Sequence, residues 1–93
     1  MADFDSARIT PDIAGQVLWY YGEVSGARRP GSFASALLAA IAAADPGNQA
    51  RLALGFPGYV VAVQTIQRPD GVEELRDIAE GVRTVSTGGE EDQ

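Results

Sequence analysis

The sequence predicts an all-α fold, a compact bundle of four to five short helices followed by a disordered acidic C-terminal tail. The five prolines divide the 93 residues into short segments, and each stands where a helix can begin or a turn can form. Within most segments, apolar residues recur at the three- and four-residue spacing of an amphipathic helix. We expect a flexible N-terminal arm at residues 1–9, a single helical domain at 10–83, and the tail at 84–93.

The first helix is expected from about Pro11 to Val24. Thr10 is a typical N-cap, Pro11 suits the first helical position, and Asp12 is favourable near the positive end of the helix dipole. One face collects the apolar residues that we expect to pack on the core, namely Ile13, Val17, Tyr20, Tyr21 and Val24. The helix should end between Gly22 and Gly26, before a loop at residues 25–31.

The second helix is expected from Ser32, as N-cap, to about Ala44. Its apolar face consists of Phe33, Leu37, Ile41 and Ala44, and its opposite face is almost entirely alanine. The sequence has no charge between Arg29 and Asp45, and this uncharged run is shorter than the ~20 residues that a membrane span needs. We therefore expect a helix that is buried on most sides.

The middle of the chain contains one short predicted helix and one segment that could be a helix or a strand. Asp45 and Pro46 predict a short helix at about residues 46–54 that stops at Gly55. The β-branched content of residues 59–66 favours a strand, whereas the spacing of Tyr59, Val63 and Ile66 matches a helix. We prefer the helix, because a lone strand in a helical chain would have no partner.

Residues 69–71 are expected to form a turn before a final amphipathic helix. The apolar stripe of this helix consists of Val72, Leu75, Ile78, Ala79 and Val82. Its solvent side carries acids that Arg76 and Arg83 can pair with along the helix, namely Glu73, Asp77 and Glu80.

Three residue types that carry much of enzyme chemistry are missing from the chain. It has no cysteine, no histidine and no lysine, so its seven cationic residues are all arginine. These absences exclude thiol nucleophiles, zinc–thiolate sites, the usual general base and a Walker-type phosphate loop. Asp3 and Asp5 are too few for a metal site, and Ser32 and Ser35 lack a base to activate them. We therefore expect a protein that is not an enzyme and that binds no cofactor or metal.

The net charge of −6 is concentrated at the C-terminal end. Residues 1–69 are neutral overall, whereas residues 70–93 hold eight acidic residues and two arginines. Because this region repels phosphates, we expect no nucleic-acid partner. No secretory signal opens the chain, so we expect a cytoplasmic protein with no membrane partner.

Residues 20–63 contain a series of short motifs, namely Arg29–Phe33, Ala36-Leu37, Ala44-Asp45, Asn48, Arg51-Leu52 and Gly55–Pro57. Through these motifs this part of the chain resembles small accessory proteins of actinobacteriophages, of the mycobacteriophage type. The resemblance implies a mostly helical phage protein in the cytoplasm of the bacterial host, of a kind whose biochemical role is generally unassigned. It identifies no catalytic residue.

Trp19 is the strongest candidate for a functional residue. It is expected on the side of the first helix opposite Ile13, Val17 and Val24, above bare backbone at Gly15 and Gly22. Trp19 either anchors a partner protein or a second copy of the chain, or belongs to the core on a second side of a central helix. A partner surface around it would include Glu23, Arg28 and Arg29. The two arginines also precede a helix N-terminus and could hold an anion there, although loop solvation explains them equally well.

Three classes of function are compatible with these features. The first is a binding protein that occupies a host or phage protein during infection and can inhibit a host process. The second is a small homo-oligomeric structural or assembly protein. The third is a helix-turn-helix DNA-binding regulator around Asp45–Gly47, whose recognition segment at residues 48–54 would offer Arg51 as its one cation.

Overall fold

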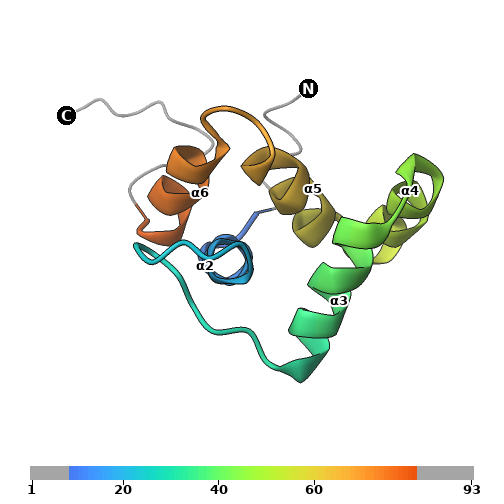
Figure 1. Ribbon diagram of the computed structural model, residues 1–93, viewed down its shortest axis with the longest axis horizontal. Coiled ribbons are helices and arrows are strands. Elements are labelled where there is room, and N and C mark those ends of the chain that lie inside the picture. The colour runs from blue at the N-terminus through green and yellow to red at the C-terminus, as the bar shows by residue number, and fades with distance from the viewer. Residues whose placement is uncertain (1–8, 82–93) are drawn as a thin grey trace.

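The computed structural model describes residues 9–81, which form five α-helices and no strand (Figure 1). In chain order the helices are α2 (Pro11–Tyr20), α3 (Ser32–Ala43), α4 (Pro46–Gly55), α5 (Pro57–Ile66) and α6 (Gly71–Ala79). The prediction of an all-α fold is therefore confirmed. The predicted tail at 84–93, the arm at 1–8, and Val82 and Arg83 of the predicted last helix lie outside the described residues.

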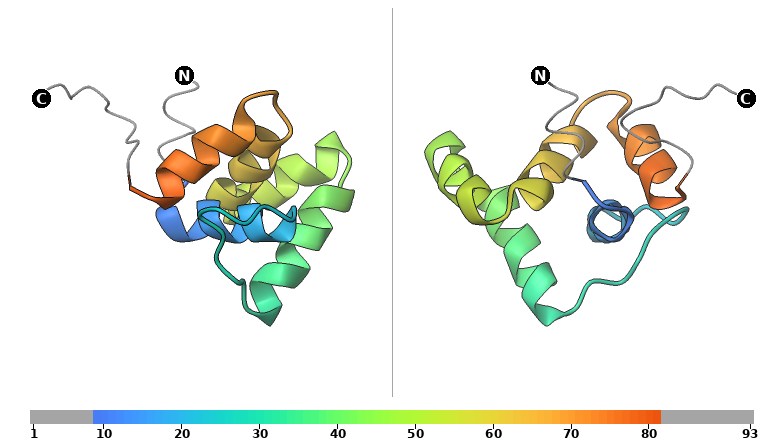
Figure 2. Two further views of the ribbon diagram at one scale, coloured as in Figure 1. Left: turned by 60° about the vertical axis from the view of Figure 1, so that its left-hand side comes forward. Right: turned by 180° about the vertical axis from the view of Figure 1, so that it is seen from behind.

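Helices α2 and α5 form the centre of the bundle. α2 packs against α6, α5 and α3, and in Figure 1 it is seen nearly end-on between α6 and α3. α5 packs against all four other helices. α4 contacts only α3 and α5, so it lies at the outer edge, on the opposite side of the molecule from α6 (Figures 1 and 2).

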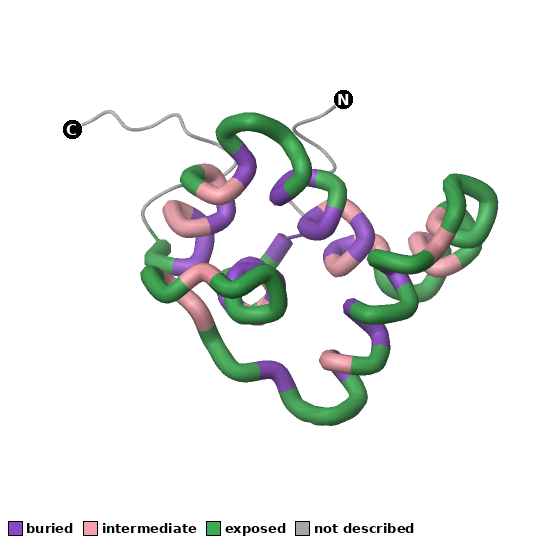
Figure 3. Tube along the Cα trace, in the orientation of Figure 1, coloured by how far each residue is buried: buried purple, intermediate pink, exposed green. Residues whose placement is uncertain are grey.

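The core lies where these helices meet, and Figure 3 shows the buried segments facing this centre. Its largest fully buried side chains are Val17, Leu18, Leu38, Ile41, Val63 and Leu75. Ile9 is only 5% exposed and belongs to the same cluster, so the arm predicted over residues 1–9 is one residue too long. Ile9 directly precedes the N-cap of α2, where an apolar residue can pack against the fourth helical position, here Ala14.

Two of the predicted helix starts are confirmed in atomic detail. The Thr10 hydroxyl accepts a hydrogen bond from the Ile13 amide at 3.1 Å, and the Asp45 carboxylate accepts one from the Asn48 amide at 2.8 Å. The start of α3 differs from the prediction, because Gly31 is the N-cap and Ser32 is already helical. No side chain caps the start of α3.

The predicted end of the first helix is wrong, and its predicted core face is right only for Val17, which is buried, and for Ile13, which packs against the core. α2 ends at Tyr20, and the core receives Ala14, Gly15, Val17 and Leu18. Val24, expected in the core, is 89% exposed, and Tyr20 and Tyr21 are also exposed. The buried face of α2 is therefore centred near Leu18. The small residues Ala14 and Gly15 on this face let neighbouring segments pack close to the helix.

The second helix is also less buried than predicted. α3 buries one face, made of Ala34, Leu37, Leu38 and Ile41. Phe33 is 65% exposed, and most of the remaining alanines are exposed as well. The lack of charge suggested burial on most sides, but α3 packs only on α2, α4 and α5 and leaves its outer side open.

The ambiguous segment at residues 59–66 is helical, as preferred. It lies in α5, whose buried residues are Gly58, Val60, Ala62, Val63, Thr65 and Ile66. The buried Thr65 hydroxyl donates to the Val61 carbonyl oxygen at 2.8 Å, which satisfies a polar group inside the core. The β-branched residues thus serve packing between helices.

Helix α4 has no buried residue, although Leu52 and Ala53 pack against the core with part of their surface, and polar contacts add to its attachment. The Gln49 side-chain amide donates to the Ile41 carbonyl oxygen at 3.2 Å, and the Gln64 amide donates to Gln49 Oε1 at 3.1 Å. Gln49 therefore links α4 to the end of α3 and to α5. Among the described helices, α4 is the one that adds no fully buried residue to the core.

Helix α6 is amphipathic, as predicted, with Leu75, Ile78 and Ala79 buried. Gly71 at its start is also buried, and a Cβ there would overlap the Thr65 carbonyl oxygen. Only glycine therefore permits this close approach between the start of α6 and the end of α5. In the part of the chain that the structure describes, no helix is long and apolar enough to cross a membrane.

Candidate protein-interaction site

The C-terminal end of α2 exposes three consecutive aromatic residues, Trp19, Tyr20 and Tyr21, which we call the aromatic end of α2. Trp19 is 44% exposed and does not belong to the buried cluster. The rings of Tyr20 and Tyr21 pack edge to face, with their centroids 5.3 Å apart. The core of this helix is already filled by Val17 and Leu18, which leaves the aromatic side chains available.

A Schellman motif fixes the aromatic end of α2. Gly22 adopts a left-handed conformation with φ of 85°, and its amide donates to the Trp19 carbonyl oxygen at 3.0 Å. The Glu23 amide donates to the Leu18 carbonyl oxygen at 2.9 Å, which completes the motif. Gly22 therefore ends the helix, and it holds the aromatic residues on a rigid last turn.

The second glycine next to Trp19 has a different role from the one predicted. Gly15 is buried, and the aliphatic part of the Arg28 side chain lies over it. The Arg28 amide also donates to the Gly15 carbonyl oxygen at 2.9 Å. The expected bare backbone at Gly15 is thus covered by the returning chain, whereas no atom lies within 4 Å of the Cβ position at Gly22.

Arg28 links three parts of the fold. Its guanidinium donates to the Asp12 carboxylate at 2.6 Å and to the Ala79 carbonyl oxygen at 2.9 Å, at the end of α6. The guanidinium that was a candidate for binding an anion at the start of α3 is therefore already engaged in contacts within the fold. Arg29, the neighbouring candidate, is exposed. The structure therefore gives the two arginines separate environments.

Glu23 also takes part in the fold, since its carboxylate lies 3.5 Å from the guanidinium of Arg76 on α6. The sequence predicted that Arg76 pairs along its own helix, but this pair joins α6 to the segment after α2. Close by, the Ser25 hydroxyl donates to the Glu80 carboxylate at 3.4 Å. Of the six predicted site residues, Gly15, Glu23 and Arg28 hold the segment after α2 in place beside Trp19.

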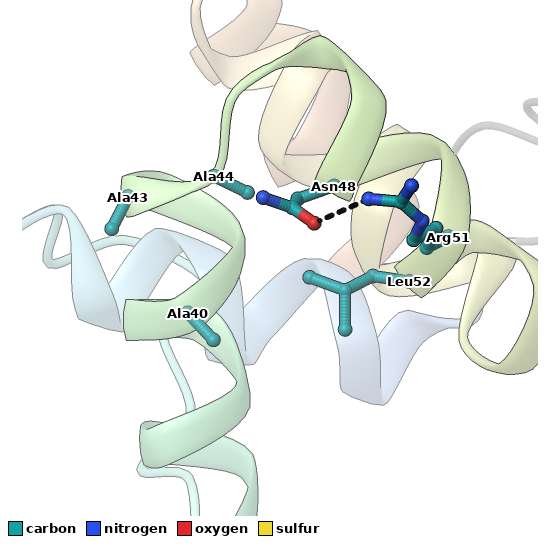
Figure 4. A pocket seen from close by; sticks show the side chains of 6 residues that line it. All are labelled: Ala40, Ala43, Ala44, Asn48, Arg51 and Leu52. Atoms are coloured by element: carbon teal, nitrogen blue, oxygen red, sulfur yellow. Dashed lines mark hydrogen bonds between the residues drawn. The ribbon is translucent and has the colours of Figure 1, made fainter.

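Sequence reasoning missed a second exposed apolar surface, on α3 and α4. The rings of Phe33 and Phe56 lie 5.7 Å apart, although both residues are exposed. A groove of about 380 Å³ also runs between α3 and α4, and Figure 4 shows the side chains that line it, namely Ala40, Ala43, Ala44, Asn48, Arg51 and Leu52. The uncharged run between Arg29 and Asp45 was the signal that could have revealed this surface.

Two other possibilities, a metal site and a DNA-binding helix at α4, can be compared with the described residues. Within residues 9–81, no group of three or more His, Cys, Asp or Glu residues could hold a metal ion. Arg51 is the one cation of α4, and its guanidinium donates to the Asn48 side chain at 3.0 Å. Comparison with protein-family models, with curated proteins and with solved structures found no match.

Proposed function

We propose that this chain is a non-enzymatic bacteriophage accessory protein that binds a host or phage protein through the aromatic end of α2. The observation that carries this proposal is the exposure of Trp19, Tyr20 and Tyr21 on a helix whose core face is filled by other residues. Tryptophan and tyrosine are enriched at the centres of protein interfaces, where they supply much of the binding energy. The phage origin and the cytoplasm of the bacterial host as location rest on the sequence resemblance.

The rigidity of this surface supports the same function. The Schellman motif at Gly22 and the Arg28 contacts hold the last turn of α2 and the segment after it. A binding site on a preorganised helix loses little conformational entropy when its partner arrives. Glu23 follows Tyr21 by two positions and adds a charge beside the aromatic residues, where charges influence partner choice and association rate.

A pull-down from an actinobacterial lysate tests the proposal. The full chain serves as bait, alongside Trp19→Ala and the control Leu54→Ala, which removes a side chain that is 88% exposed on α4. We expect a partner that both the original chain and Leu54→Ala retain and that Trp19→Ala loses. With that partner purified, Trp19→Ala should weaken binding about 30-fold or more by calorimetry. Equal capture by all three chains would contradict the proposed site.

A homo-oligomeric assembly protein is the second candidate, because the exposed side of α3 carries no charge and includes Phe33. This function predicts association of the purified chain with itself, without a host partner. Such association would involve a different surface from the aromatic end of α2.

A further inference from the structure

The segment between α2 and α3 crosses the line where α2 meets α6 without fully burying a side chain of its own. Residues 24–29, which we call the strap, are all exposed or half-buried, and Val24 is 89% exposed. In Figure 1 the strap leaves the end of α2, passes beside the end of α6 and then turns towards α3. Ala27 packs against the core with part of its surface, and the first buried residue after the strap is Pro30. The strap therefore has little apolar burial to hold it in place.

Polar contacts of Ser25 and Arg28 attach the strap to the helices. The Ser25 hydroxyl donates to the Glu80 carboxylate at 3.4 Å. The Arg28 guanidinium pairs with the Asp12 carboxylate, and the two side chains are 43% and 79% exposed. Among the described residues, one backbone hydrogen bond joins the strap to a helix, from the Arg28 amide to the Gly15 carbonyl oxygen at 2.9 Å. Ion pairs that are this exposed contribute little to stability, and salt weakens them.

Buried side chains of α2 and α6 lie directly beneath the strap. A Cβ at Gly26 would lie 3.4 Å from Leu18 Cδ1 and 3.5 Å from the Ala79 Cβ. Leu18 and Ala79 are 0% and 3% exposed, so the backbone at Gly26 covers this part of the core. Gly26 has a φ of 81°, a conformation that glycine adopts and leaves easily. Movement of the strap would therefore expose Leu18 and Ala79.

The closed strap also leaves one polar atom beneath it unsatisfied. Arg76 Cγ lies 3.6 Å from the same Cβ position on Gly26, and Arg76 Nε is buried with no hydrogen-bond partner among the described residues. A buried N–H group without a partner destabilises the arrangement that buries it, and contact with water removes this cost. The closed arrangement thus carries an unfavourable contribution that an open strap lacks.

We propose that the strap opens as a unit while the described helices stay packed. The Schellman motif at Gly22 and the buried Pro30 fix its two ends. Opening breaks the Arg28 contacts, exposes Leu18 and Ala79, and lets water reach the Arg76 side chain. The open state is a minor population at low salt, and it grows as salt weakens the attachment of the strap.

Opening enlarges the apolar surface beside the aromatic end of α2. Leu18 directly precedes Trp19, so a protein bound at Trp19 contacts more apolar area when the strap is open. Such a partner stabilises the open state in proportion to this additional contact. This consequence rests on the binding function proposed above, whereas the opening itself is a property of the fold and is tested without a partner.

A thiol introduced beneath the strap tests the opening, since the chain has no cysteine. The strap covers position 79 in Ala79→Cys, whereas the control Ala62→Cys places the thiol in α5, at a position that is 0% exposed. Reaction with a maleimide under native conditions is followed by mass spectrometry. We expect Ala79→Cys to react about tenfold faster or more, because the strap opens more often than the whole fold unfolds. Urea denaturation corrects for any difference in the stability of the two variants.

Asp12→Asn tests whether Arg28 holds the strap closed. Asp12 lies on α2 and is joined to the end of α6 by Arg28, so its effect at position 79 distinguishes strap opening from fraying of α6. In the Asp12→Asn background, Ala79→Cys should react about threefold faster or more, and salt should accelerate the reaction less than in the original background. Glu74→Gln is the matched control, since it neutralises the acid of an ion pair with Arg68 outside the strap. It should leave the reaction rate unchanged.

Hydrogen exchange of the original chain repeats the test without a substitution. The Arg28 amide should exchange about tenfold faster or more than the amide of the fully buried Val63, and salt should accelerate it. Equal corrected rates for Ala79→Cys and Ala62→Cys would overturn the proposal. So would a rate at position 79 that Asp12→Asn leaves unchanged, or an Arg28 amide that exchanges only together with the amide of Val63.

Discussion

The side chain of Arg28 occupies the space beside Gly15, and its Cγ lies 2.7 Å from the position that a Cβ on Gly15 would take. The same arginine reaches the Asp12 carboxylate and the end of α6. The segment after α2 can return along the helix only because residue 15 has no side chain. Gly15 and Arg28 thus act as one structural unit that supports the turn next to Trp19.

Gly15→Ala should therefore destabilise the protein, although alanine is the better helix former. The clash with Arg28 costs about 1–3 kcal/mol, against a helix-propensity gain of about 1 kcal/mol. Urea denaturation of the variant measures the net loss. In an Arg28→Ala background most of the clashing atoms are gone, so the same substitution should cost clearly less. Equal costs in the two backgrounds would contradict the role of Arg28.

Gly71→Ala should be far more damaging. The added Cβ would overlap the carbonyl group of Thr65, which is backbone and cannot rotate away. Repacking α5 against α6 should cost about 3 kcal/mol or more, visible as a lower midpoint of urea denaturation. Gly55→Ala is the matched control, since nothing lies within 4 Å of its Cβ position at the end of α4. It should be neutral or stabilising by up to about 1 kcal/mol.

Features with local causes could be predicted from the sequence. The starts of α2 and α4 follow from Thr10-Pro11 and Asp45-Pro46, because a capping side chain and a proline act within three residues of themselves. The helical state of residues 59–66 could be inferred from the absence of any partner strand. Features of this kind depend mainly on residues that are close to them in the sequence.

Features that depend on distant segments could not be predicted. The sequence placed Val24 in the core because it continues a helical pattern, but Gly22 ends the helix before that position. Gly15 was read as bare backbone, since nothing in the sequence shows that Arg28, thirteen residues later, returns to cover it. The exposed side of α3 was missed for a similar reason, because alanine and phenylalanine fit a buried helix and an open face equally well.

The cap of α4 offers a local test. Asp45→Ala removes the acceptor for the Asn48 amide and should cost about 1 kcal/mol. Because α4 has no buried residue, this loss should appear as faster hydrogen exchange at the first amides of α4, with little change in α2 or α6. Asp45→Asn keeps a side-chain acceptor and should preserve the protection. The measurement is made at low concentration, so that self-association does not contribute.

Leu18 and Trp19 are neighbours in the sequence, but Leu18 lies in the core and Trp19 on the proposed binding surface. Leu18 is fully buried, so Leu18→Ala should lower the free energy of unfolding by about 2–5 kcal/mol. Trp19→Ala removes a side chain that is 44% exposed and outside the buried cluster, so it should cost clearly less, about 1–2 kcal/mol. Thermal denaturation followed by circular dichroism compares the two variants without relying on tryptophan fluorescence. If Trp19→Ala destabilised the fold as strongly as Leu18→Ala, the aromatic end of α2 would be part of the core, and the binding site proposed there would have to be abandoned.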